Sequence, residues 1–212
     1  MTGPGTRRGG YLDMRVGEFL DELAAARPAP GGGSAAALAL AFAAALCAMT
    51  AELSVRHLTQ APGLAAEARA LLHRAAPLAQ ADAEAYAGVL AALRAPGQTD
   101  VRQREEQVSA ALARASEVPL EVAELGDGVA ALAADVADRG NPAVRGDALA
   151  AAQLAAAAAR TAAALVQINL AEMPDDPRPT QAAQWAADAA RLAARAARLP
   201  GPSSREAPAP RS

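Results

Sequence analysis

The chain has 212 residues, enough for one domain with a sizeable core, and its formal net charge at pH 7 is −3. Hydrophobic residues make up 52% of the sequence but aromatic residues only 2%, so alanine supplies much of the apolar surface. With no basic excess and few rings to stack on bases, the composition argues against nucleic-acid binding.

The reactive side chains exclude several classes of enzyme. All 20 cationic residues are arginine, which excludes a Schiff-base lysine and a phosphate-loop lysine. The single cysteine, Cys47, cannot form an intramolecular disulfide and is expected to be a small buried hydrophobe. Only His57 and His73 offer nitrogen ligands, so we expect no metal site.

Helical periodicity interrupted by proline and glycine predicts an all-α protein without strands. We expect an up-and-down bundle of about six to eight helices in one domain, residues 11–199, between disordered tails at 1–10 and 200–212. The expected helices cover residues 15–26, 34–57, 63–94, 101–116, 120–139, 144–172 and 180–199. Pro77 predicts a kink or a break within 63–94. The segments 101–116 and 120–139 are either a pair of helices or one helix bent at Pro119.

Two of these helices, 34–57 and 144–172, are alanine-rich and are expected to form the central pair of the bundle. Alanine contributes little to membrane insertion, and Arg160 lies near the middle of the second helix, so we predict core helices rather than membrane spans. Because each alanine buries little area, stability must come from many contacts along the helices or across subunits, and we expect an oligomer. The N-terminus lacks the apolar stretch of a secretory signal, which favours a cytoplasmic location.

Both alanine-rich helices follow a polar loop that contains glycine: PAPGGGSAAALALA and GNPAVRGDALAAAQLA. A helix start presents free backbone N–H groups that can hold an anion, and glycines let a ligand approach the backbone. Taken alone, the first loop is more typical of a flexible turn in which Ser34 caps the following helix.

Several segments taken together resemble the cyclodeaminase/cyclohydrolase family. They are PAPGGGSAAAL, DAEAYAGVL, EVPLEVAE, and GNP followed by an aspartate and a helix ending in INL, in order between Val16 and Leu199. The resemblance implies a helical subunit, a homodimer, and a folate site lined by these loops. It implies action on the 5,10-methenyltetrahydrofolate ring, either its closure with ammonia release or its opening by water to 10-formyltetrahydrofolate, without a cofactor.

Both reactions need proton transfer and stabilisation of positive charge, which a buried carboxylate can supply. Asp147 matches the family motif and is our first candidate catalytic residue, although an aspartate in the first turn of a helix also offsets the helix dipole. Asp82 is the second candidate, with Glu84 as its possible pair, and a solvated edge of a helix is the alternative explanation for both.

The expected substrate-binding residues come from the two loops and the end of the second alanine-rich helix. They are Pro30, Gly31, Gly32, Gly33, Ser34, Asn141, Arg145 and Asn169. Helix capping is the competing explanation for Asn141. Arginines near the loops, among them Arg56, Arg139 and Arg145, are candidates to bind the glutamate tail of a folate.

The chain also departs from the family pattern. GNPAVRGDAL stands where members commonly have GNPNAVSDAG, and VQINL, with Gln167, where VRINL is usual. These departures leave a second interpretation open, in which the protein is a homologue that binds folate or serves as a scaffold without turnover. A third interpretation is an interaction protein whose small-residue helices serve only dimerisation. Whether a separate formimidoyltransferase is a partner is also open.

Overall fold

The computed structural model describes residues 10–94 and 101–198, and these form an all-α structure. The predicted tails at 1–10 and 200–212 therefore lie outside the described residues, except for Gly10. The helices, including two short 3₁₀ helices marked η, are η1 (Tyr11–Asp13), α1 (Val16–Ala24), α2 (Gly32–Glu52), α3 (Ala61–Ala75), α4 (Leu78–Arg94), α5 (Val101–Ala115), α6 (Glu117–Arg139), η2 (Pro142–Val144), α7 (Arg145–Asn169) and α8 (Arg178–Ala196).

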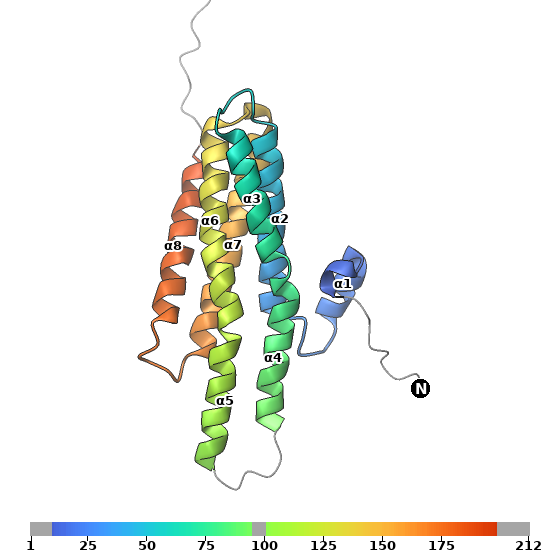
Figure 1. Cartoon of the computed structure of the whole chain (residues 1–212), viewed down its shortest axis with the longest axis vertical. Coiled ribbons are helices and arrows are strands. Elements are labelled where there is room, and N and C mark those ends of the chain that lie inside the picture. The colour runs from blue at the N-terminus through green and yellow to red at the C-terminus, as the bar shows by residue number, and fades with distance from the viewer. Residues whose placement is uncertain (1–9, 95–100, 199–212) are drawn as a thin grey trace, which may run out of the picture.

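These helices build an elongated up-and-down bundle, which confirms the predicted fold class (Figure 1). The helices α3 and α4 follow each other along one side of the bundle, and α5 and α6 do the same beside them. The alanine-rich helices α2 and α7 pack against each other and run in opposite directions, with α6 and α8 packed on α7. The short helix α1 lies to one side of the bundle, near the middle of its length.

Both expected breaks are present. Pro77 separates α3 from α4, because proline cannot donate to the preceding turn. The break between α5 and α6 falls at Ser116, three residues before Pro119, which lies in the first turn of α6, where a missing N–H costs nothing. The Ser116 hydroxyl donates to the carbonyl oxygen of Leu112 at 2.9 Å.

The core is made chiefly of alanine, as the composition predicts, and its helices come very close together. At Gly126 of α6, an added Cβ atom would lie 2.9 Å from Cβ of Ala159 and 3.2 Å from the carbonyl oxygen of Ala155, both on α7. Residues 32–52 and 142–169 are long and apolar enough to cross a membrane by length and composition, but both pack inside the bundle. They are core helices, as we expected.

Candidate functional site

The first glycine loop leads directly into α2. Pro30 is buried and joined to Ala29 by a cis peptide bond, and Gly31 is the extended N-cap residue from which α2 begins at Gly32. The prediction that Ser34 caps this helix is therefore wrong, because Ser34 already lies within the first turn. Its side chain is fully buried and points to another helix instead.

Ser34 connects the start of α2 to α4. Its hydroxyl lies 2.8 Å from the carbonyl oxygen of Ala79 and 3.2 Å from Oδ2 of Asp82. Gly33 brings the two helices together, since an added Cβ atom would lie 2.7 Å from Oδ2 of Asp82 and closer still to its Oδ1 and Cγ. Only glycine leaves room for this carboxylate, so the loop and Asp82, two of the predicted site elements, form one cluster.

The surroundings of Asp82 suit a group that exchanges protons. Burial raises the pKa of its carboxyl above the ordinary aspartate value, while hydrogen bonding from Ser34 partly opposes the shift. The free N–H groups at the start of α2 favour the negative charge. Glu84, the possible partner of Asp82, is exposed, and it accepts a hydrogen bond from Nε2 of Gln80 at 3.0 Å. The two acidic side chains therefore have different environments.

Two cavities are lined by chain neighbours of this cluster, Ala81 in one and Ala35 in the other, and Tyr11 lines both. One, of about 410 Å³, is almost entirely apolar and lies between α1 and α2, with Phe19, Leu38 and Phe42 among its walls. The other, of about 380 Å³, is lined by Gln80 and by further residues of η1 and α4. Their volumes fall in the range of small-molecule sites. Apolar space for a ring system is therefore lined by chain neighbours of the cluster, while Asp82 itself lines neither cavity.

The second glycine loop lies at the other end of α2. The backbone N–H of Asn141 donates to Oγ of Ser54 at 2.9 Å, and its Nδ2 donates to the carbonyl oxygen of Leu53 at 3.1 Å. Its Oδ1 accepts from the backbone N–H of Ala143 at 3.0 Å, which caps η2. Gly140 lies tightly against Ser54, because an added Cβ atom would lie 2.6 Å from the Ser54 hydroxyl. The capping explanation for Asn141 thus matches its contacts.

Arg145 and Asp147 begin α7 at this same end. Nη2 of Arg145 donates to the carbonyl oxygens of Ala196 at 2.9 Å and Arg198 at 2.7 Å, which secures the end of α8. Asp147 is exposed in the first turn. Since α2 has 21 residues, the two loops are separated by about 30 Å within one subunit. One chain therefore does not place Asp147 beside Asp82.

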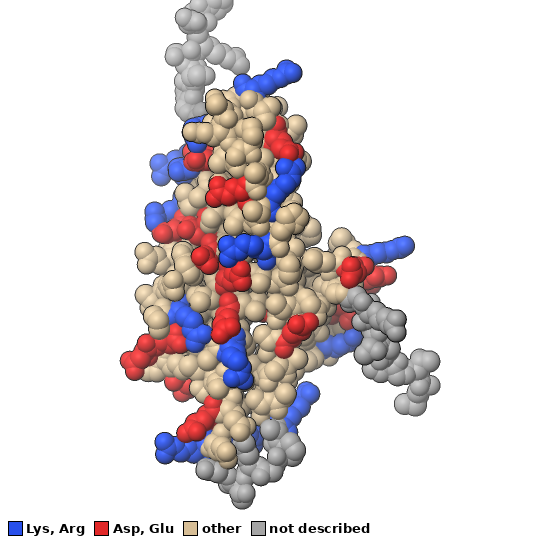
Figure 2. Space-filling view, viewed as in Figure 1, with Lys and Arg blue, Asp and Glu red and all other residues tan. Residues whose placement is uncertain are grey.

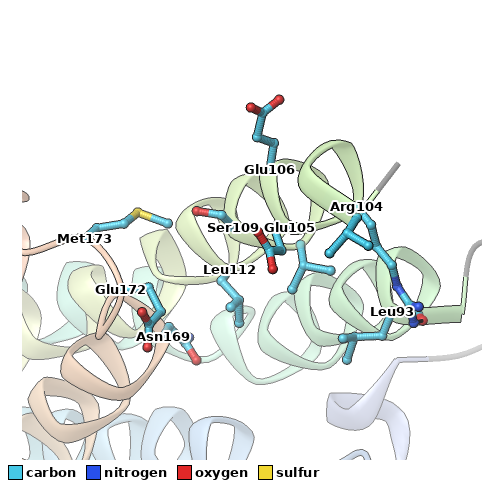
Figure 3. Close-up of a pocket in the computed structure, with 11 residues that line it drawn as sticks. Leu93, Arg104, Glu105, Glu106, Ser109, Leu112, Asn169, Glu172 and Met173 are labelled. Carbon is cyan, nitrogen blue, oxygen red and sulfur yellow. Dashed lines mark hydrogen bonds between the residues drawn. The ribbon is translucent and has the colours of Figure 1, made fainter. Parts of the chain in front are cut away.

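Asn169, at the end of α7, lines a third cavity of about 750 Å³ between that end and α5 (Figure 3). Figure 3 shows Asn169 and Glu172 on one side and Leu112 on the other, with Arg104 at the far end beside Leu93. Nη2 of Arg104 donates to the carbonyl oxygen of Leu93 at 2.9 Å. This cavity shares no lining residue with the two cavities that Tyr11 lines.

Charged side chains of both signs are interspersed on the face shown in Figure 2, over α5, α6 and α8. Arg139 pairs with Asp135 at 2.7 Å, while Arg56, His57 and His73 are exposed. Within the described ranges, no three histidine, cysteine or acidic side chains gather in a way that suits a metal ion.

The sequence analysis missed Tyr11 and Gln80. Tyr11 lies five residues before the start of α1. Its position depends on Gln80, 69 residues away, whose Oε1 accepts a hydrogen bond from the Tyr11 backbone N–H at 3.4 Å. No local pattern indicates such a contact. The presence of two aromatic residues, Tyr11 and Phe19, near the glycine loop was the available signal.

Comparison with known proteins gives one consistent family. A family model described as formiminotransferase-cyclodeaminase matches residues 15–188. A methenyltetrahydrofolate cyclohydrolase of Methylorubrum extorquens is 34% identical over 166 residues, covering 74% of this chain and 79% of that protein. The crystal structure of a formiminotetrahydrofolate cyclodeaminase from Thermotoga maritima superimposes with a TM-score of 0.76 at 25% identity, covering 87% of this chain and 94% of that one.

Proposed function

Because the chain belongs to the formiminotransferase-cyclodeaminase family, we propose that it is a methenyltetrahydrofolate cyclohydrolase in which Asp82 transfers protons. Family and relatives indicate a folate activity of the cyclodeaminase or cyclohydrolase type. The higher identity to a cyclohydrolase favours the water reaction. One observation carries the assignment to Asp82: its half-buried carboxylate lies on Gly33 and is hydrogen-bonded to Ser34. The chain neighbours Ala81 and Ala35 each line a cavity.

The substrate defines what the site must do. In 5,10-methenyltetrahydrofolate, one carbon joins two nitrogens that share a positive charge. Water adds to this carbon and loses both of its protons: the bond from the carbon to N5 breaks, N5 takes up one proton, and the other is released to solvent, which leaves the neutral 10-formyl product. A carboxylate beside the carbon stabilises the cation, accepts one proton from water and returns it to N5.

Asp82 meets these needs in its ionised form. The start of α2 and Ser34 hold the carboxylate in place, and burial brings its pKa closer to neutrality than that of a solvated aspartate. A base with a raised pKa holds the proton more firmly and still releases it to a nitrogen. The apolar cavity beside α1 offers a place for the flat rings of the folate. This chemistry uses water and a carboxylate, and we propose that it needs neither metal nor cofactor.

Cyclodeaminase activity is the second candidate, favoured by the family description and by the superimposed Thermotoga maritima structure. Two assays separate the candidates: loss of 5,10-methenyltetrahydrofolate followed by its near-ultraviolet absorbance, and its formation from 5-formiminotetrahydrofolate with ammonia release. We expect loss faster than in an enzyme-free blank. Faster formation alone would replace the first candidate by the second, and absence of both would refute an active folate enzyme.

We also propose that the protein is a homodimer through an apolar face shared by α2 and α7, called here the α2/α7 face. Its exposed side chains are Phe42 and Met49 on α2, Leu53 at the C-cap of α2, and Leu154 and Ile168 on α7. Spacings of seven and four residues in the first set and of fourteen in the second, each a whole number of turns within about 40°, keep each set on one side of its helix. Phe42 and Leu154 also line the same cavity. Such a self-complementary face suits a two-fold dimer, and we place this dimer in the cytoplasm.

A two-fold dimer with its axis across the helices would place the start of α7 of one copy toward the start of α2 of the other. Asp147 of one subunit would then approach Asp82 of its partner, which gives Asp147 its proposed catalytic role. Mixing Asp82→Asn and Asp147→Asn subunits tests this, since half of the mixed dimers' sites keep both aspartates. We expect each variant alone to be inactive and the re-associated mixture to recover about a quarter of wild-type activity; an inactive mixture would refute the shared site.

A further inference from the structure

We propose that Tyr11, which precedes the residues matched by the family model, contacts the bound substrate and fixes its position relative to Asp82. This inference rests on the proposed function, because it takes the two cavities that Tyr11 lines as the folate site. It adds a substrate-contacting residue from a segment outside the family match.

Tyr11 is held at the site from several directions. Its backbone N–H donates to Gln80, which lies two residues before Asp82 on α4. The η1 turn is closed by Asp13, whose Oδ2 accepts from the backbone N–H of Gly10 at 2.9 Å. These contacts tie the segment before α1 to the helix that carries the proposed acid and base.

The Tyr11 ring packs on one aromatic neighbour and against the buried core, and Tyr11 also lines both cavities. Its centroid lies 5.4 Å from that of Phe19, and the ring planes meet at 71°, the edge-to-face arrangement that aromatic pairs prefer. Phe19 is buried, whereas Tyr11 is only partly buried and forms part of the walls of both cavities. A folate ring in either cavity would therefore contact Tyr11.

The hydroxyl of Tyr11 is suited to donate a hydrogen bond. Burial raises the pKa of Tyr11, and the negative charges of nearby carboxylates raise it further. These carboxylates are Glu22, Asp82 and Glu84. The group therefore stays protonated over the working pH range, and the polar edges of a pterin or the carbonyl group of its side chain are suitable acceptors.

The experiment compares Tyr11→Phe and Tyr11→Ala with wild type in the absorbance assay, and records a thermal melt of each. Tyr11→Phe keeps the ring and its packing on Phe19 but loses the donor. We expect its KM to rise about three- to tenfold, as for one neutral hydrogen bond, with little change in kcat and an unchanged melting temperature. Tyr11→Ala should raise KM further. The matched control is Tyr86→Phe, because Tyr86 is exposed on α4 and lines neither cavity.

The outcomes separate this inference from the proposed function. An unchanged KM in both Tyr11 variants, with wild-type enzyme active, would overturn the role of Tyr11 and leave the proposed function standing. A KM that rises only together with a lowered melting temperature would also overturn it, since Tyr11 would then act through folding. A wild-type enzyme without folate turnover would instead refute the proposed function on which the inference rests.

Discussion

Replacing Gly33 by alanine should disable the site while leaving the helix intact. The new Cβ atom would lie 2.7 Å from Oδ2 of Asp82, where ordinary contact begins at 3.4 Å, so that Oδ2 must retreat by 0.7 Å and Oδ1 by more. A displacement of about 1 Å in a catalytic group can cost about a hundredfold in rate. We therefore expect kcat/KM to fall by about two orders of magnitude.

The fold should tolerate this change. Alanine is favoured over glycine inside a helix by about 0.5–1 kcal/mol, and the displaced atoms belong to the end of a side chain. The thermal melt should therefore stay within a few degrees of wild type. The neighbouring variant Gly32→Ala is the matched control, because nothing lies within 4 Å of its added Cβ atom. Wild-type turnover by Gly33→Ala, or an equal loss in Gly32→Ala, would refute the role given to the Gly33–Asp82 contact.

Three further predictions follow from burial and packing. Burial raises the pKa of Asp82, and the ionised carboxylate is the base, so kcat/KM should fall as the pH falls through that raised pKa. A pH profile of kcat/KM that is flat through the acid range would contradict this. Gly126→Ala should destabilise the protein by about 1–3 kcal/mol in urea unfolding, whereas Gly128→Ala, whose added Cβ atom lies 3.6 Å from its nearest neighbour, should not. Burial raises the pKa of Cys47 to about 12, so a thiol reagent at pH 8 should label Cys47 only as fast as the protein unfolds. Rapid labelling of the folded protein would show that the thiol is accessible and would contradict this prediction.

The helices were predictable because their signals are local. Alanine and leucine periodicity defines the segments, and Pro77 ends a helix wherever the rest of the chain lies. The role of Ser34 was not predictable in this way, since it depends on Asp82, 48 residues later. A capping serine and a serine that joins two helices look alike in the sequence.

The candidate site was predictable only in part, for the same reason. The family resemblance selected both Asp82 and Asp147, but the antiparallel packing of α2 and α7 places their loops at opposite ends of one subunit. Tyr11 has no motif of its own and becomes a candidate only through its contact with Gln80 and its place between two cavities.

The most direct test of the central claim is the rate of 5,10-methenyltetrahydrofolate loss with wild type and with Asp82→Asn, each measured against the enzyme-free reaction. Asparagine keeps the size and shape of the side chain and removes the charge and the basic oxygen, while Asp175→Asn, at an exposed turn, controls for the loss of one negative charge. The account predicts acceleration by wild type and by Asp175→Asn, and a rate equal to the blank for Asp82→Asn. Undiminished acceleration by Asp82→Asn would contradict it.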